Sequence, residues 1–280
     1  MILLADSGST KTEWALIKDD KSVIKFKTIG LNPVFVSTQD VVNEIKLTEL
    51  KKYFTDVNYV YFFGAGCSTV VRQTIILDAL NKLFINAVVK VDSDLLGAGI
   101  SQLGEGKGII GILGTGSNTG IYSNGEIVEN ISSLGYILGD EGSGAVIGKA
   151  FVKLFLNNEL PEIISQKFIK KYNYNLDDII AKVYKEPFPN RFLASFMPFV
   201  YENKNDNIVK NMLYNSFSEF FEKTICKYNN YQKYDFKLIG SIAFYFGDII
   251  GDICILKGIN LVSVSQSPLN ALVKYYINKH

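Results

Sequence analysis

Asp6-Ser7-Gly8-Ser9-Thr10-Lys11-Thr12 and Gly114-Thr115-Gly116-Ser117-Asn118-Thr119-Gly120 are the two stretches that decide the fold of this 280-residue chain. Each follows an apolar run typical of a buried strand and precedes a run typical of the return strand of a hairpin. Glycine allows close approach of the backbone to a ligand, and adjacent backbone N–H groups in such turns form an anion-binding concavity. Two turns of the same order indicate a duplicated fold that binds one polyphosphate.

The composition limits the classes of function. The length fits two domains of roughly 100–150 residues each. A net charge of +1, with acidic and basic residues interspersed, argues against nucleic-acid and membrane-surface partners. Only Arg72 and Arg191 among the 29 basic residues are arginines. Planar phosphate clamps are therefore scarce, and backbone N–H groups, lysine and a metal ion would have to bind phosphate.

Cysteine and histidine offer little chemistry. Cys67, Cys226 and Cys254 are far apart in the sequence and match no zinc or cluster spacing, so we expect buried structural thiols. The single histidine, His280, is the last residue, which leaves no histidine for acid–base chemistry. The first residues lack the pattern of a signal peptide, and no apolar run approaches the length of a membrane span. We expect a soluble cytoplasmic protein.

The first part of the chain predicts an α/β domain. Strands are expected at 1–5, 12–18, 22–28, 57–63 and 87–91, and helices at 38–52, at 70–85 and from Asp94. This βββαβαβα pattern is typical of a partly parallel sheet covered by helices.

The pattern restarts at Gly108, with strands expected at 108–113, 119–123 and 126–130. A helical segment at about 143–232 follows, then a strand at 235–239, a helix at 241–256, a strand at 259–264 and a last helix at 268–279. The glycine-rich residues 103–108 suit a hinge. We expect an N-terminal domain, 1–105 with the helix 267–280, and a C-terminal domain, 106–266.

Several acidic and basic residues lie where a site is expected, and each has a structural alternative. Asp6, at the end of a strand beside the first turn, could organise Mg²⁺ or could cap the hairpin as an Asx turn. Lys11 could contact a phosphate or be a solvated hairpin charge. Asp92 and Asp94 lie at the carboxyl end of a strand, where ligands of open sheets bind, but either could be a helix N-cap.

The motifs resemble those of one superfamily over the whole chain. The Asp6–Thr12 and Gly114–Gly120 stretches look like the two phosphate motifs of the actin, Hsp70 and sugar-kinase superfamily, and Leu238-Ile239-Gly240-Ser241 looks like its adenosine motif. Gly139-Asp140-Glu141-Gly142-Ser143-Gly144 resembles the N-acetylglucosamine kinase branch of the BadF/BadG/BcrA/BcrD ATPase family. The resemblance implies two actin-like ATPase (ribonuclease H-like) domains with a ligand cleft between them.

The resemblance also implies an activity. It is that of an ATP- and Mg²⁺-dependent kinase that phosphorylates an amino sugar, foremost the 6-hydroxyl group of N-acetylglucosamine, and that forms a homodimer. Asp94-Leu95-Leu96-Gly97-Ala98 matches the Asp-x-x-Gly-small pattern of the general base and favours Asp94 over Asp92. Such a base need not be strong, because phosphoryl transfer depends mainly on positioning and charge neutralisation.

The resemblance to this family also implies which residues form the site. Asp6 would organise the metal. The sugar-binding residues would be Asn32, Asp94, Gly135 and Asp140, although Asn32 could also be a pre-proline turn residue and the Gly135–Gly144 stretch a capped loop. The ATP-binding residues would be Ser7, Gly8, Ser9, Thr10, Lys11, Thr115, Gly116, Ser117, Asn118, Gly240 and Ser241. Leu134 replaces an aromatic residue of the family pattern, which leaves the identity of the amino sugar open, and Asn270 replaces a glycine of that pattern.

Two other functions remain open. One is an ATPase activator of a 2-hydroxyacyl-CoA dehydratase system, which would carry a [4Fe–4S] cluster between subunits and need suitable thiolates. The cysteines here do not match that pattern. The other is a non-catalytic sugar or nucleotide sensor, against which the presence of both Asp6 and Asp94 argues.

Overall fold

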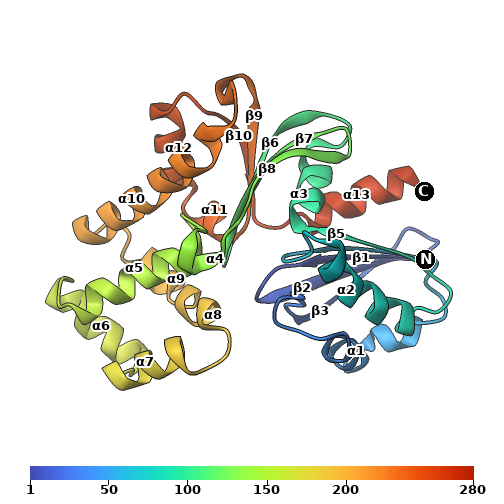
Figure 1. Ribbon diagram of the computed structural model, residues 1–280, viewed down its shortest axis with the longest axis horizontal. Helices are drawn as coiled ribbons and strands as arrows, with labels where there is room; N and C mark the ends of the chain where they lie inside the picture. Colours follow the sequence, from blue (N-terminus) through green and yellow to red (C-terminus); the bar gives the residue numbers. More distant parts are fainter. The chain divides into compact units, whose positions relative to one another are not determined.

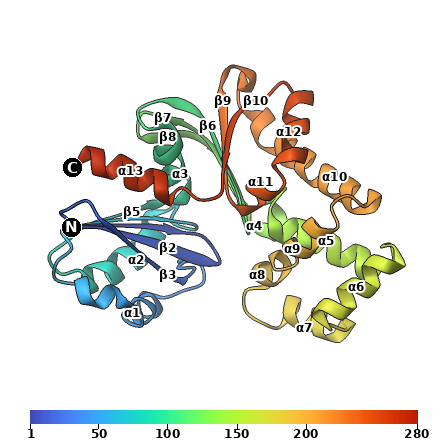
Figure 2. The same ribbon diagram turned by 180° about the vertical axis from the view of Figure 1, so that it is seen from behind.

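The computed structural model describes residues 1–280, which form two five-stranded sheets with helices on their faces (Figures 1 and 2). The first sheet contains β1 Ile2–Ser7, β2 Lys11–Ile17, β3 Val23–Ile29, β4 Tyr59–Gly64 and β5 Val88–Ser93, in the order β3-β2-β1-β4-β5. The second contains β6 Lys107–Leu113, β7 Ser117–Ser123, β8 Glu126–Ile131, β9 Asp235–Ile239 and β10 Asn260–Ser265, in the order β10-β9-β6-β7-β8.

The two sheets have the same topology. Numbered from its own first strand, each has the order 3-2-1-4-5. In the first sheet β1 is antiparallel to β2 and parallel to β4, and β4 is parallel to β5. In the second sheet the corresponding last pair, β9 and β10, is also parallel. The duplicated α/β fold expected from the repeated turns is thus confirmed.

The first sheet is covered by helices on both faces. Leu3, Ala5, Trp14 and Phe62 are fully buried in a core shared with α1 Thr38–Lys46 and α2 Val70–Leu83. The other face carries α3 Asp94–Leu103 and α13 Leu269–Lys279, and both ribbon views show these two pairs of helices on opposite sides of the sheet. Because side chains alternate along a strand, neighbouring residues of β1 face different helix pairs.

Helices account for most of the chain between β8 and β9. They are α4 Gly135–Leu138, α5 Gly144–Leu156, α6 Glu162–Tyr172, α7 Leu176–Tyr184, α8 Pro189–Ala194, α9 Met197–Glu202, α10 Asn207–Lys223, η2 Ile225–Lys227 and η3 Tyr231–Lys233. Phenylalanine and tyrosine rings pack edge to face in this segment. Phe168, for example, lies 5.1–5.3 Å from Phe151, Phe196 and Phe199, measured between ring centroids.

Two predicted helices are interrupted. The helix expected at 38–52 ends at Lys46, and a 3₁₀ helix, η1 Glu49–Tyr53, follows because the hydroxyl group of Thr48 caps it by accepting the N–H of Leu50. The helix expected at 241–256 consists of α11 Ser241–Tyr245 and α12 Gly247–Leu256. The short helix α4 was not predicted.

The chain forms two compact units. The first comprises Met1–Ile110, Gly120–Glu129 and Ser267–His280, and the second comprises Gly111–Thr119 and Asn130–Gln266. Residues 120–129, expected in the C-terminal domain, pack with the first unit. The last helix belongs to the first unit as well.

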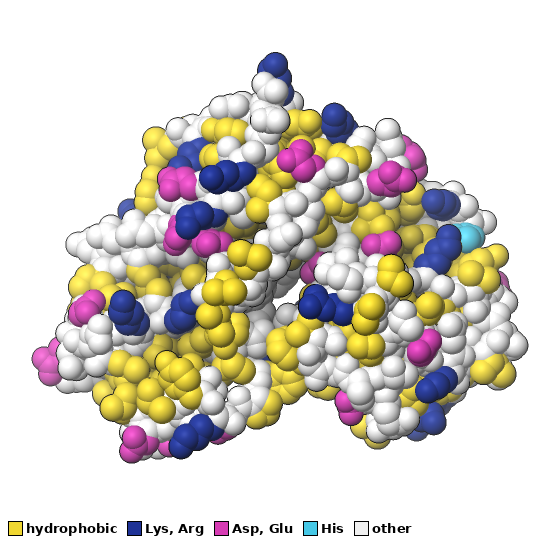
Figure 3. Space-filling model, in the orientation of Figure 1, with side chains coloured by type: hydrophobic (Ala, Val, Ile, Leu, Met, Phe, Trp, Pro, Cys, Tyr) yellow, Lys and Arg dark blue, Asp and Glu magenta, His cyan; other side chains and the backbone are white.

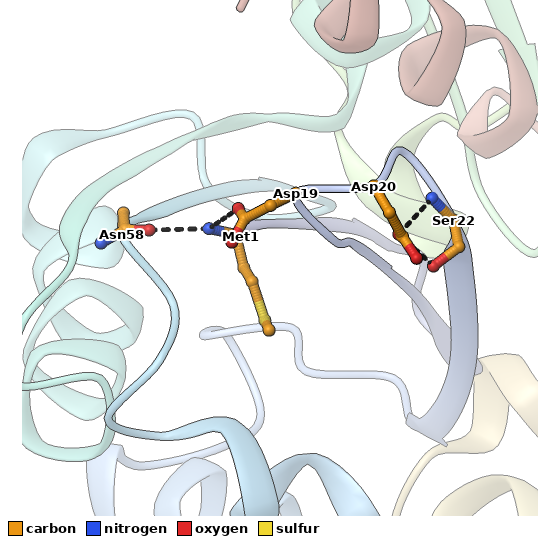
Figure 4. A network of polar contacts seen from close by, with 5 residues as sticks. All are labelled: Met1, Asp19, Asp20, Ser22 and Asn58. Carbon is orange, nitrogen blue, oxygen red and sulfur yellow. Dashed lines mark hydrogen bonds and ion pairs between the residues drawn. The ribbon is translucent and has the colours of Figure 1, made fainter.

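The amino group of Met1 joins two loops at one end of the first sheet (Figure 4). It donates hydrogen bonds to the side-chain oxygens of Asp19, at 3.1 Å, and Asn58, at 2.7 Å. In the same turn the carboxylate of Asp20 accepts hydrogen bonds from the backbone N–H and the hydroxyl group of Ser22. These contacts fix the hairpin between β2 and β3.

The surface in Figure 3 shows acidic and basic side chains interspersed, as the net charge near zero predicts. No helix of the structure has the length and apolar character needed to cross a membrane.

Close helix packing in the second unit depends on Gly148 of α5. A Cβ atom at this position would lie 2.0 Å from the backbone oxygen of Leu193 in α8. We expect Gly148→Ala to lower the free energy of unfolding by about 1–3 kcal/mol, because backbone must move to accept the methyl group.

Gly251→Ala is the matched control. Gly251 also lies inside a helix, but no atom lies within 4 Å of the place that a methyl group would take there, so the change should be neutral or stabilising by up to about 1 kcal/mol. Thermal unfolding of both variants tests the assignment, and equal midpoints would contradict it.

Candidate functional site

A row of charged side chains crosses the first sheet on the face covered by α3 and α13. Asp6 of β1 pairs with Glu13 of β2, which pairs with Lys27 of β3. On its other side Asp6 pairs with Phe63 of β4, which pairs with Asp92 of β5. Directly paired residues project from the same face. Glu13 was missed in the sequence, although a hairpin that pairs Ser7 with Thr12 across residues 8–11 would have placed it opposite Asp6.

Asp6 is electrostatically strained. Burial, followed by repulsion from Asp94 and Glu13, raises its pKa from 3.8 to about 7, against the attraction of Lys11. Burial also acts to raise the pKa of Glu13, but hydrogen bonding with Lys11 and Ser267 outweighs it and lowers that pKa. The end of β1 is therefore a place where three carboxyl groups influence one another, and a cation there would relieve their repulsion.

The first glycine turn is held by its own backbone and by Gly30. The N–H of Gly8 donates to the carbonyl oxygen of Lys11 at 3.0 Å, and the N–H of Gly30 donates to that of Thr10 at 2.9 Å. A Cβ atom on Gly30 would lie 2.4–2.5 Å from the carbonyl oxygens of Ser9 and Gly8. Only glycine fits this contact, which fixes the turn against the end of β3.

Ser7 has a structural place in this turn. Its side chain is fully buried on the face opposite Asp6, and its hydroxyl group lies 2.8 Å from that of Thr12. The same hydroxyl oxygen accepts the N–H of Leu31 at 3.2 Å. The side chain of Ser7 is thus engaged inside the first unit. Its expected contact with phosphate has no support from this geometry, because Ser7 follows Asp6 by one residue and points the other way.

Asp94 begins α3 at the carboxyl end of β5. The helix is capped by Ser93, whose hydroxyl oxygen accepts the N–H of Leu96 at 3.2 Å, so neither Asp92 nor Asp94 is the N-cap. Gly97 brings α3 against the sheet, since a Cβ atom there would lie 2.7 Å from Phe63. Asp94 lies near enough to Asp6 to raise its pKa.

Asn32 is buried and has one hydrogen-bonding group to offer. Its Oδ1 accepts the N–H of Val34 at 2.9 Å, and its side chain packs against Gly66, where a Cβ atom would lie 2.2 Å from Oδ1. The side chain is thus held by the loops after β3 and β4. The Nδ2 group makes no hydrogen bond within the protein, so Asn32 can act as a donor to a ligand.

In the second unit the second glycine turn packs on the start of α5. The N–H groups of Gly144 and Ala145 donate to the carbonyl oxygens of Gly114 and Thr115 at 2.8 and 3.1 Å. These first amides of α5 are therefore used by the turn. β7 begins at Ser117, so the turn is shorter than predicted, and Ser117 is buried.

Asp140 lies beside this turn. It has a left-handed backbone, φ 54°, and its carboxylate accepts the hydroxyl group of Ser133 at 2.6 Å. A Cβ atom on Gly116 would lie 2.9 Å from its Oδ2. Burial raises the pKa of Asp140, although hydrogen bonds from Ser133, Gly135 and Ser117 oppose the rise. Asp140 thus links the second turn to Ser133 and to the start of α4.

The remaining predicted residues lie in the second unit. Gly240, φ 124°, lies against Leu113 at the end of β6, while Ser241 is exposed at the start of α11. Asn118 accepts the N–H of Thr119 and an amide N–H of Asn130. The two family departures are also placed. Leu134 is 61% exposed before α4, and Asn270 accepts a hydrogen bond from Lys25.

Each unit therefore gathers its predicted residues at the carboxyl ends of its strands. The first unit holds Asp6, the Gly8–Lys11 turn, Asn32 and Asp94, and the second holds the Gly114–Gly116 turn, Asp140 and Gly240. No group of three or more acidic, cysteine or histidine side chains is arranged to hold a metal ion directly. The raised pKa of Asp6 among like charges fits a hydrated divalent cation, since Mg²⁺ commonly keeps several water ligands.

The sequence matches a known family. The model of the BadF/BadG/BcrA/BcrD ATPase family matches residues 5–216. No curated protein sequence matches the chain.

Solved structures share the fold over its whole length. A Porphyromonas gingivalis protein named as a "putative N-acetylglucosamine kinase" is 38% identical, with a TM-score of 0.94 and 100% of both chains covered. A Chromobacterium violaceum protein with the same description is 17% identical, with a TM-score of 0.72 and 98% of both chains covered. A ROK family glucokinase from Streptomyces griseus, in complex with glucose and AMPPNP, is 14% identical, with a TM-score of 0.58 and 98% of this chain and 97% of that chain covered. The fold is thus that of actin-like sugar kinases.

The pKa of Asp6 predicts how stability depends on pH. Because this pKa is higher in the folded than in the unfolded chain, the folded state keeps its proton between about pH 4 and 7 and loses relative stability as the pH rises through that window. Asp6→Asn, which imitates the protonated group, should raise the thermal unfolding midpoint more at pH 8 than at pH 5. The free energy of unfolding of the variant should exceed that of the wild type by about 4 kcal/mol at most.

Asp20→Asn should behave in the opposite way. Hydrogen bonds from Ser22 lower the pKa of Asp20, so the carboxylate contributes stability at neutral pH that is lost on acidification. This control variant should unfold at a lower temperature than the wild type at pH 8, with the difference shrinking toward pH 3. If both variants showed the same pH trend, the strain assigned to Asp6 would be wrong.

Proposed function

The chain belongs to the BadF/BadG/BcrA/BcrD ATPase family, and we propose that it is an ATP-dependent kinase that phosphorylates an amino sugar, N-acetylglucosamine above all. The observation that carries the proposal is Asp6 at the end of β1, where burial and then Asp94 raise its pKa, directly before a glycine turn and in the same unit as the buried Asn32. The similarity at 38% identity to the P. gingivalis protein supports the choice of sugar.

ATP is the phosphoryl donor in this proposal. The backbone of residues 8–10 and of the Gly114–Gly116 turn would bind its phosphates, and Gly240 with Ser241 would bind the adenosine part. Asp6 would hold Mg²⁺ through water molecules. When bound, the metal neutralises charge on the phosphates and orients them.

The acceptor sugar would be bound by Asn32 and Asp94 of the first unit and by Asp140 with Gly135 of the second. Asn32 donates a hydrogen bond through Nδ2, since its oxygen is already used by Val34. Asp94 accepts the proton of the reacting hydroxyl group and orients it. Its position at the first residue of α3, which is capped by Ser93, keeps it beside Asp6.

The dehydratase-activator function has less support. Cys67 and Cys254 are buried, and burial raises the pKa of each thiol to about 12, whereas cluster ligands are thiolates. Cys226 is half-buried. A protein purified without oxygen that contained stoichiometric iron and sulfide would favour the activator over the kinase.

Release of ADP against a panel of sugars tests the proposed function. The panel contains N-acetylglucosamine, N-acetylmannosamine, N-acetylmuramic acid, glucosamine and glucose. We expect the highest kcat/KM with N-acetylglucosamine and phosphate on its 6-hydroxyl group. No release with any sugar would favour a sensor or activator. Light scattering of the same sample tests the homodimer that the resemblance implies.

Asp94→Asn should lower kcat by about 10²–10⁴-fold, because the variant cannot accept the hydroxyl proton. Its affinity for Mg·ADP, measured by calorimetry, should stay within about threefold. Asp92→Asn is the matched control, since Asp92 lies on the same strand end but accepts the N–H of Ser93. Retained turnover in the Asp94 variant, or loss in the Asp92 variant alone, would overturn the assignment of the base.

Asn32→Asp tests the acceptor site separately. Aspartate keeps the oxygen that accepts the N–H of Val34 but lacks the Nδ2 donor. We expect the KM for the sugar to rise about 10–100-fold, the range for one lost hydrogen bond in a buried site, with the KM for ATP unchanged. An unchanged KM for the sugar would remove Asn32 from the site.

A further inference from the structure

Glu13 is a carboxylate that the proposed reaction does not use, although it lies directly opposite Asp6. The register pairs Asp6 with Glu13 across β1 and β2, so both side chains project toward α3 and α13. The side chain of Glu13 is only 18% exposed. A half-buried carboxylate beside Asp6 is unfavourable unless other groups compensate its charge, and the partners of Glu13 do so.

Both oxygens of Glu13 are engaged within the first unit. Oε1 lies 3.1 Å from Nζ of Lys11 and 3.9 Å from Nζ of Lys27. Oε2 accepts the hydroxyl group of Ser267 at 3.1 Å. Ser267 lies just before α13, so the carboxylate is held from the start of the last helix and from two strands. Glu13 is thus fixed in one orientation.

The consequence concerns Lys11. Its side chain is 61% exposed, and a free lysine side chain in such a place loses rotamer entropy on binding a ligand. Lys11 and Glu13 are two residues apart on β2 and therefore share a face. The ion pair holds the ammonium group near Glu13 and Asp6, at the strand end where the first turn begins. An exposed pair of this kind adds little stability, so its effect is chiefly on position.

We propose that Glu13 is a positioning residue for the nucleotide, which holds the ammonium group of Lys11 beside the first turn so that it meets the phosphates of ATP. Glu13 itself contacts neither phosphate nor metal. The inference rests on the proposed use of ATP but not on the identity of the acceptor. The proposal also accounts for the hydrogen bond from Ser267, because this bond orients the carboxylate of Glu13, and the carboxylate in turn orients Lys11.

Calorimetric binding of Mg·ADP without sugar tests the role of Glu13. Glu13→Gln loses the charge but keeps an oxygen for Ser267, and it should weaken binding about 5–20-fold. Lys11→Gln should weaken binding by a similar factor. The double variant should be no weaker than Lys11→Gln alone, because Glu13 acts through Lys11. Lys27→Gln, which removes the longer ion pair only, should bind within about twofold of the wild type.

The outcomes separate the possibilities. If the wild type binds Mg·ADP and Glu13→Gln binds equally well or more tightly, Glu13 is no positioning residue and the proposed kinase stands. Additive losses in the double variant would show a role independent of Lys11 and overturn the inference. If the wild type binds no nucleotide, both proposals fall. Glu13→Asp, which keeps the charge, replaces the glutamine variant if that does not fold and should show an intermediate loss.

Discussion

The in-register pairing of β1 with β2 and β4 is the constraint on which the site depends. β1 is the central strand of its sheet, and its odd residues, such as Leu3 and Ala5, are fully buried against α1 and α2. A shift of one residue would move these side chains to the other face and bring Asp6 into the apolar core. The burial of apolar side chains on one face therefore determines where the carboxylate on the other face lies.

The fold tolerates a charge conflict at this point because apolar burial elsewhere stabilises it. Asp6, Glu13 and Asp94 approach one another where water is scarce, and the pKa of Asp6 rises to about 7 as a result. Lys11 and Lys27 offset part of the repulsion through Glu13. Strained charges of this kind concentrate at functional sites. In the proposed reaction a bound cation would offset the repulsion that the protein alone leaves.

The fold was largely predictable, and the orientation of individual groups was not. Repeated turns and the restart at Gly108 were sufficient to predict two α/β halves, and the shared strand order confirmed them. Which backbone groups of a turn are hydrogen-bonded within the protein depends on packing between segments far apart in the sequence. The sequence could not show that Gly114 and Thr115 accept the first amides of α5. The inward orientation of Ser7, by contrast, follows from strand alternation and could have been predicted.

The two turns differ in chemistry although they belong to the same repeated fold. When the ends of β1 and β6 are aligned, Ser7 with Leu113, Ile112 stands where Asp6 stands in the first half, so the second strand end supplies no carboxylate of its own. Its nearby acid, Asp140, comes instead from the loop before α5 and is tied to Ser133. A cation held by the strand end can therefore belong only to the first unit. In the proposed reaction the metal and the general base would therefore both belong to the first half of the repeated fold. The second half would contribute a turn without a charged side chain, whose backbone suits phosphate.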